Sequence, residues 1–113
     1  MQFEAAPQLF ATIAIMSIVA LRLIDLRERL RLHPNAPASH SGFDKLELEI
    51  LRLKLERPIF TVEDVVLAVG QLGGHLNRNS DGMPGWQTLH RGMIKLRALV
   101  EGARSASKLN EFG

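Results

Sequence analysis

Apolar side chains recur three and four positions apart along most of the chain, which is the spacing of a helix face. The first such segment predicts a helix over residues 4–33, where Leu23, Leu26 and Leu30 alternate with charged side chains in the second half. The first half is apolar on nearly all sides. We therefore expect a core helix buried on more than one side, against a partner chain or another domain.

Three further patterns predict shorter helices. In the segment "FDKLELEILRLKLE" (43–56), the apolar alternation slips between Ile50 and Leu51, and the residues are mostly helix formers, so we predict a helix. Thr61 is a candidate N-cap for a helix over 62–77, with Glu63 and Asp64 in its first turn. A last helix is predicted over 86–104 from the apolar positions Trp86, Leu89, Met93, Leu96 and Val100, all expected in the core.

The breaks between these segments predict the organisation of the chain. Pro34 opens a stretch rich in Pro, Ser and Gly over 34–42, which we interpret as a linker between a long apolar helix (1–33) and a helical domain (43–104). Residues 105–113 are expected to form a frayed tail. The fold class is all-α, with about four helices and a tight helix-turn-helix corner at 72–92.

Composition narrows the class without giving a function. The chain of 113 residues is 46% hydrophobic and 23% charged, which fits one small globular domain. It has no cysteine, and its formal charge of +2 neither requires nor excludes a nucleic-acid partner. An uncharged run of 17 residues spans 5–21, but a membrane helix needs about 20 apolar residues, so a core helix is favoured.

The corner raises the question of a ligand loop because four glycines are crowded into residues 72–85. Their spacing fits neither a phosphate loop nor a dinucleotide fingerprint, and no strand is predicted before them. We instead expect Gly73, Gly74 and Gly92 to let two helices approach closely. The histidines lack the spacing of a metal site, and no nucleophile, base or carboxylate pair converges on a catalytic constellation.

Basic residues gather on the first helix and around the corner. They are Arg22, Arg27, Arg29, Arg31, Arg78, Arg91, Lys95, Arg97 and Arg104. A solvated helix face is the favoured interpretation. The alternative is contact with DNA phosphates, for which Arg78, Arg91 and Lys95 are the candidates.

The corner also resembles a known family. Seventeen positions over 31 residues match its pattern: Leu72, Gly73, Gly74, Leu76, Arg78, Asp81, Gly82, Pro84, Gly85, Trp86, Leu89, Arg91, Gly92, Leu96, Leu99, Val100 and Gly102. They resemble the C-terminal dimerisation domain of bacterial DDE transposases of the insertion-sequence-four (Tn-five-like) group. The segments "SIVALRLIDL" (17–26) and "RLHPNAP" (31–37) resemble the exit helix of the transposase core and its linker. Leu21 and His90 depart from the pattern, since the family often carries tryptophan there.

The resemblance implies a module for subunit dimerisation and synapsis in cut-and-paste DNA transposition, in a bacterial cytoplasm. Its partners would be a second copy or a full-length transposase, with transposon-end DNA reached indirectly and no membrane. The corner and the last helix would carry the interface.

Family cores hold three catalytic carboxylates and a divalent metal ion, expected to be Mg²⁺. The chain has no tyrosine and so lacks the signature around the last of these carboxylates. We therefore expect no strand cleavage, and no cofactor, for this chain alone.

Three alternatives remain open. A dimerisation module without a catalytic centre can form mixed dimers with a full-length transposase and inhibit transposition in trans. It can equally be a non-functional remnant of a mobile element. A third alternative, less favoured, is a small membrane protein built on residues 5–24.

Overall fold

The computed structural model describes the backbone of residues 6–76 and 82–112, and this part of the chain is all-α. Its helices are α1 (Ala6–Leu32), α2 (Lys45–Leu55), α3 (Val62–Leu72) and α4 (Trp86–Phe112), with a single 3₁₀ turn, η2 (Ala38–His40), between α1 and α2. Among these residues no strand forms, and one isolated bridge joins Pro37 to Thr61. The prediction of an all-α domain with about four helices is therefore confirmed.

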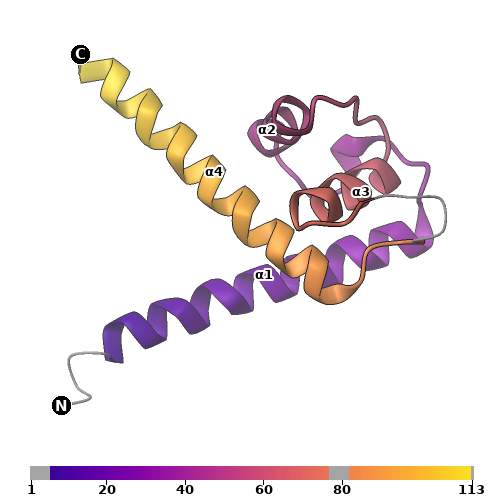
Figure 1. Ribbon diagram of the computed structural model, residues 1–113, viewed down its shortest axis with the longest axis horizontal. Helices are drawn as coiled ribbons and strands as arrows, with labels where there is room; N and C mark the ends of the chain where they lie inside the picture. Colours follow the sequence, from indigo (N-terminus) through magenta and orange to yellow (C-terminus); the bar gives the residue numbers. More distant parts are fainter. Residues whose placement is uncertain (1–5, 77–81, 113) are drawn as a thin grey trace.

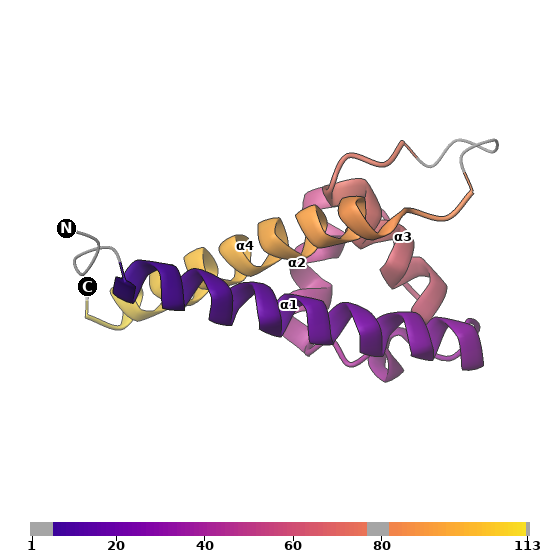
Figure 2. The same cartoon turned by 90° about the horizontal axis from the view of Figure 1, so that it is seen from below.

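The two long helices cross near the start of α4 and then diverge, whereas α2 and α3 pack together on one side of the crossing (Figure 1). The view from below shows α1 and α4 extending in the same direction beyond the packed region (Figure 2). The core fills the space between the crossing and the two short helices. Its fully buried side chains include Leu23, Leu26, Leu51, Ile59, Val62, Val65, Val66, Val69 and Leu96.

Local capping fixes where the short helices begin. Thr61 is the N-cap of α3, as predicted: its side chain accepts a hydrogen bond from the Asp64 amide, and the Asp64 side chain accepts one from the Thr61 amide. Asp44 and Glu47 form the same reciprocal box at the start of α2. Asp44 followed by Glu47 three positions later is the sequence signature of this second box, and it indicates that α2 begins after Asp44 rather than at residue 43.

Two helix ends differ from the sequence prediction. Helix α3 stops at Leu72 rather than near residue 77, because Gly73 caps it and Gly74 adopts a φ of +107°, a conformation that only glycine takes readily. As a result Leu76, which falls within the predicted helix 62–77, lies beyond the end of α3 and is 68% exposed. Helix α4 continues to Phe112 rather than ending at 104, because the segment after Arg104 contains helix formers and no proline.

The segment 34–42 is part of the folded domain rather than a free linker. Ala38 donates its backbone N–H to Phe60, and Val62 donates to Ala36. Ala38 and Ser41 are buried. These contacts hold the segment against the start of α3, and the core includes residues from Val19 to Val100 on both sides of it.

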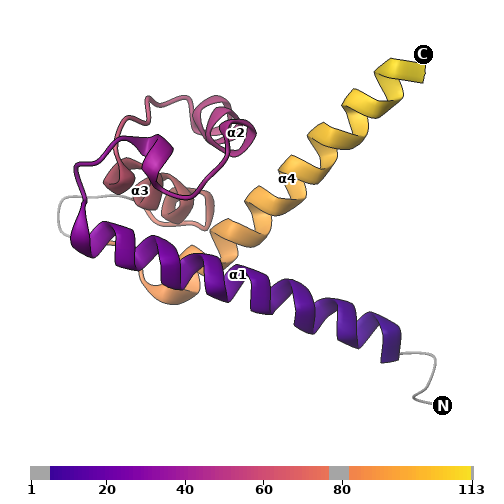
Figure 3. The same ribbon diagram turned by 180° about the vertical axis from the view of Figure 1, so that it is seen from behind.

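Helix α1 consists of two unlike halves. From Val19 onward it places Val19, Leu23 and Leu26 in the core, but every residue from 8 to 18 is exposed. We call residues 8–18 the α1 arm; it projects away from α2 and α3 (Figure 3). The prediction of a buried helix is therefore wrong for this half within the chain itself, because the side chains that α1 buries begin at Val19; burial against a partner chain stays a prediction.

Candidate functional site

At the corner, the backbones of α3 and α4 lie in direct contact, without side chains between them. A Cβ added to Gly92 would lie 1.9 Å from the carbonyl oxygen of Val69, and one added to Gly73 would lie 2.0 Å from that of Thr88. Neither position therefore has room for a side chain. This confirms the predicted close approach at Gly73 and Gly92. It corrects the prediction for Gly74, because a Cβ added there would meet nothing within 4 Å, and both Gly73 and Gly74 follow α3 rather than lie within it.

The described residues that flank the connection between α3 and α4 contact the corner at two points. A Cβ on Gly70 would lie 2.2 Å from Cγ of Pro84, so the proline ring seats directly on the α3 backbone. The His75 ring lies within hydrogen-bonding distance of the Gly82 carbonyl oxygen, with Nε2 at 3.1 Å. Gly82 has a φ of +66°, and both it and Gly85 are exposed. Two predicted site residues, Arg78 and Asp81, lie outside the described residues.

The apolar residues predicted at the start of α4 have different environments. Leu89 and Met93 are buried in the core, as predicted, but Trp86 is 39% exposed, so its core assignment is wrong. The indole lies at the beginning of α4, on the side that meets the α1 arm, and the Arg27 guanidinium carbon is 5.7 Å from its centroid. Trp86 therefore belongs partly to the surface.

Trp86 lines a hollow of about 480 Å³ between α4 and the α1 arm. Met16 forms the wall on α1, and Gln87, His90 and Arg91 line it from α4. A separate groove of about 510 Å³ lies between α2, α3 and α4, and Lys95 lies at that groove together with Lys54. Arg91 and Lys95, both predicted phosphate contacts, are exposed on α4 but border different hollows.

Several other basic residues bind carboxylates or carbonyl oxygens of the described residues. Arg22 forms a two-pronged ion pair with Glu47, with one pair of atoms at 2.8 Å, and thereby joins α1 to α2. Arg29 binds Asp25 and the His40 carbonyl oxygen, and Arg104 lies 3.5 Å from Asp44. Arg31 binds Glu28. These arginines are therefore neutralised locally, which separates them from Arg91 and Lys95.

The α1 arm carries the most conspicuous apolar surface. Its exposed large side chains are Leu9, Phe10, Ile13, Ile15, Met16 and Ile18. The surface continues along the outer side of α1 through Leu21 and Ile24, which are 67% and 57% exposed. By length and composition α1 also satisfies the criteria for a membrane-crossing helix. An apolar surface of this extent on a small domain is typical of an interaction site.

The described residues contain no group of three or more His, Asp and Glu side chains placed to hold a metal ion. The features that stand out on this surface are the apolar arm and, beside it, an indole with Arg27 over its ring.

Comparisons of the chain with protein-family models, with curated proteins and with solved structures found no match.

Proposed function

We propose that the chain is a helical self-association module of a DNA transposase, without a catalytic centre of its own. The transposase assignment rests on the resemblance of residues 72–102. The observation that carries self-association is the exposed apolar surface of the α1 arm. Water around so many aliphatic side chains is unfavourable, and burial stabilises a complex by about 25 cal/mol per Å².

The size of the arm suits a second copy of the chain. Eleven helical residues span about 17 Å, and a cylinder of about 10 Å diameter and that length has roughly 500 Å² of lateral surface. A standard protein interface buries about 800 Å² on each partner. Phe10, Ile13, Leu21 and Ile24 lie on one side of α1 at helical spacing, so packing α1 against α1 in two copies extends the buried area beyond the arm.

Length also favours a protein partner over a bilayer. The hydrocarbon core of a membrane is about 30 Å thick, and the arm covers only about half of that. Extending a span past Val19 would pull Leu23 and Leu26 out of the core and carry Arg22 and Asp25 into lipid. The fold and a complete span are therefore mutually exclusive uses of α1.

Light scattering during size exclusion tests the proposal. We expect a dimer for the native chain and a monomer for Phe10→Asp, with unchanged helical content by circular dichroism. Gln8→Asp is the matched control, because it adds the same charge to the arm at a position that is already polar, and it should remain dimeric. A monomeric native chain would contradict the proposal. Recovery of the chain on floating lipid vesicles, abolished by Phe10→Asp, would favour the membrane alternative.

The position of the interface is a separate question, since the family resemblance implies an interface at the corner and the last helix rather than at α1. The chain has no cysteine, so single-cysteine variants report on individual positions. Ile13→Cys should form a disulfide-linked dimer under mild oxidation if α1 pairs with α1. Arg91→Cys should do so instead if the corner forms the interface. Cross-linking at both positions with equal yield would indicate random collision.

The inhibitor and remnant alternatives differ in one measurement. A trans-acting inhibitor must lower the transposition frequency of a full-length transposase of the resembled group when both are expressed together. Phe10→Asp should abolish this effect if mixed dimers form through α1. An unchanged frequency with the native chain would favour the remnant.

A further inference from the structure

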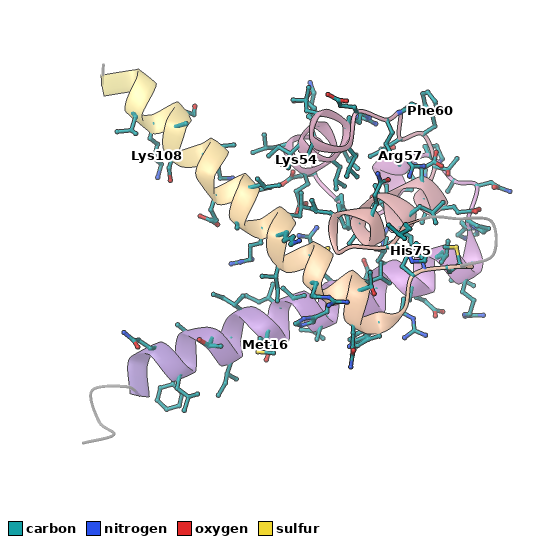
Figure 4. All side chains as sticks on the ribbon, in the orientation of Figure 1. Met16, Lys54, Arg57, Phe60, His75 and Lys108 are labelled. Atoms are coloured by element: carbon teal, nitrogen blue, oxygen red, sulfur yellow. The ribbon has the colours of Figure 1, made fainter. Side chains whose placement is uncertain are left out.

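The hollow beside Trp86 combines an aromatic ring with several hydrogen-bond donors. Four of its five lining residues come from the first two turns of α4, and the fifth, Met16, comes from the α1 arm. Figure 4 shows Met16 on α1, on the N-terminal side of the region where α1 and α4 cross. None of the five lining residues is acidic. The hollow therefore presents an apolar wall and donors without a carboxylate to neutralise them.

Arg91 lines this hollow and Arg27 lies over its indole; within the described residues both differ from the paired arginines on the rest of α1. Arg29 and Arg31 each bind a carboxylate from the preceding turn. Arg27 instead lies over the Trp86 ring, at 5.7 Å from its centroid. In the part of the chain that the structure describes, neither Arg27 nor Arg91 forms an ion pair. A guanidinium on an aromatic face keeps its charge available for an anion.

The charge continues along α4. Residues 86–100 contain Arg91, Lys95 and Arg97 and no acidic residue. Gln87, Arg91 and Lys95 follow one another at four-residue intervals, so their side chains form one row with about 6 Å between successive members. Arg91 and Lys95 are both exposed. This row leads from the hollow beside the indole to the groove between α2, α3 and α4, and it can contact successive phosphates of a strand.

We propose that the hollow binds an unpaired nucleotide of a DNA strand. Its base stacks on the exposed part of the Trp86 indole, and Arg27 and Arg91 bind the flanking phosphates. Gln87 and His90 offer hydrogen-bonding groups to the base edge. Aromatic stacking beside a cationic row is the general means by which proteins bind single strands without sequence preference. An acidic peptide makes no comparable use of a stacking ring, and a duplex keeps its base faces covered. The inference goes beyond self-association and does not depend on it.

The sequence supplies its own probe for this site. Trp86 is the only tryptophan and the chain has no tyrosine, so intrinsic fluorescence reports on this hollow alone. We expect an unstructured thymidine oligonucleotide to quench the emission, with an affinity that falls as salt rises, because bound phosphates release counterions. The same strand in a duplex, inorganic phosphate and a polyglutamate peptide should cause little quenching.

Substitutions assign the binding to named residues, measured by the anisotropy of a labelled oligonucleotide. Arg91→Gln and Arg27→Gln should each weaken binding about fivefold, as expected for loss of a phosphate contact. Lys108→Gln is the matched control: it removes one charge from the far end of α4, away from the hollow (Figure 4), and should leave the affinity within about twofold. Trp86→Phe should retain most of the binding, and Trp86→Ala should lose about tenfold.

Several outcomes would overturn the inference. One is equal loss of affinity in Arg91→Gln and Lys108→Gln, since it indicates a nonspecific charge effect. Quenching by duplex or by polyglutamate as strong as by the single strand would assign the hollow to another ligand. Because Arg91 is exposed, its substitution leaves the fold intact even if Trp86→Ala unfolds the chain. The monomeric variant Phe10→Asp should still bind the oligonucleotide, which separates failure of this inference from failure of the self-association proposal.

Discussion

The α3–α4 corner and the α1 arm are both rich in apolar and small residues, yet the first is tightly packed and the second is exposed. At the corner, α3 and α4 approach until backbone touches backbone, and Val69, Leu89 and Met93 are buried. In the arm, every residue from 8 to 18 remains exposed. The corner carries three glycines that remove side chains from the contact, whereas the arm is more hydrophobic and is left exposed by the described part of the chain.

The difference shows that hydrophobicity alone does not place a segment in the core. Burial requires a second surface of complementary shape, and α3 offers one to α4 because of Gly92 and Gly73. The arm extends beyond the reach of α2 and α3 (Figure 1). Residues that decide the corner should therefore control folding, and those of the arm should control association. Four predictions test this contrast, from the largest effect to the smallest.

The largest effect is expected at Gly92. A Cβ there would lie 1.9 Å from the Val69 carbonyl oxygen, and backbone cannot rotate aside as a side chain can. Gly92→Ala should therefore lower the free energy of unfolding by about 4 kcal/mol or more, and leave much of the chain unfolded. Gly102→Ala is the matched control on the same helix, because nothing lies within 4 Å of its added Cβ. It should stabilise the chain by about 1 kcal/mol through helix propensity. Urea titration followed by circular dichroism measures both, and similar losses in the two variants would contradict the packing argument.

The two halves of α1 should respond differently to the same loss of side-chain volume. Leu23 is fully buried, so Leu23→Ala should cost about 3 kcal/mol of unfolding free energy. Ile13 is 52% exposed, and Ile13→Ala should change the stability of the monomer by less than about 0.5 kcal/mol while weakening self-association. Monomer stability is compared in the Phe10→Asp background. If Ile13→Ala were as destabilising as Leu23→Ala there, the arm would belong to the core.

A smaller effect is expected at Arg22, where the arm meets the folded domain. Arg22 pairs with Glu47, which is only 7% exposed and also caps α2. Arg22→Met keeps an apolar stem but leaves a buried carboxylate unpaired, which should cost about 2 kcal/mol. Adding Glu47→Gln to this variant removes the charge and keeps an oxygen for the cap, so it should recover about half of the loss. Thermal unfolding gives both values, and no recovery in the double variant would contradict the assignment.

The smallest effect concerns the N-cap of α3 and depends on pH. Burial raises the pKa of the Asp64 carboxyl, but hydrogen bonds from the Phe60 and Thr61 amides and the Thr61 hydroxyl, together with the nearby Arg57 charge, outweigh it and hold the pKa below its ordinary value of 3.8. A lowered pKa adds stability above about pH 4, and this contribution is lost as the pH falls through the pKa of the folded state.

Asp64→Asn should therefore cost about 1 kcal/mol at pH 7 and less at pH 2.5. Other carboxylates also titrate, so the measured quantity is the difference in urea midpoint between the native chain and this variant at the two pH values. A constant difference would indicate that the cap acts without its charge.

Much of the fold follows from local signals in the sequence. Thr61 and Asp64 define the start of α3 because the capping box satisfies orphan amides within four residues. The helical period of Leu89, Met93, Leu96 and Val100 predicted the buried face of α4. Gly73 and Gly92 were identified as a close approach because mid-pattern glycines cost stability unless packing needs them.

Other features were not predictable from local pattern. Trp86 lies at the edge of the buried face, and whether such a position is covered depends on where α1 crosses α4. Residues 34–42 have the composition of a linker, but they hydrogen-bond to the strand-like segment before α3, a contact between positions more than twenty residues apart. The site beside Trp86 combines Arg27 with a residue of α4, and no sequence spacing links them.

The sequence by itself determined the helical class, the capped start of α3 and the glycines that bring α3 and α4 together, because these depend on neighbouring residues and on a period of 3.6. Only the tertiary structure decided which apolar surfaces are covered. Burial depends on whether another element of the chain covers a surface: Leu23 and Leu26 are fully buried in the core, whereas the α1 arm borders the start of α4 only at Met16 and stays exposed.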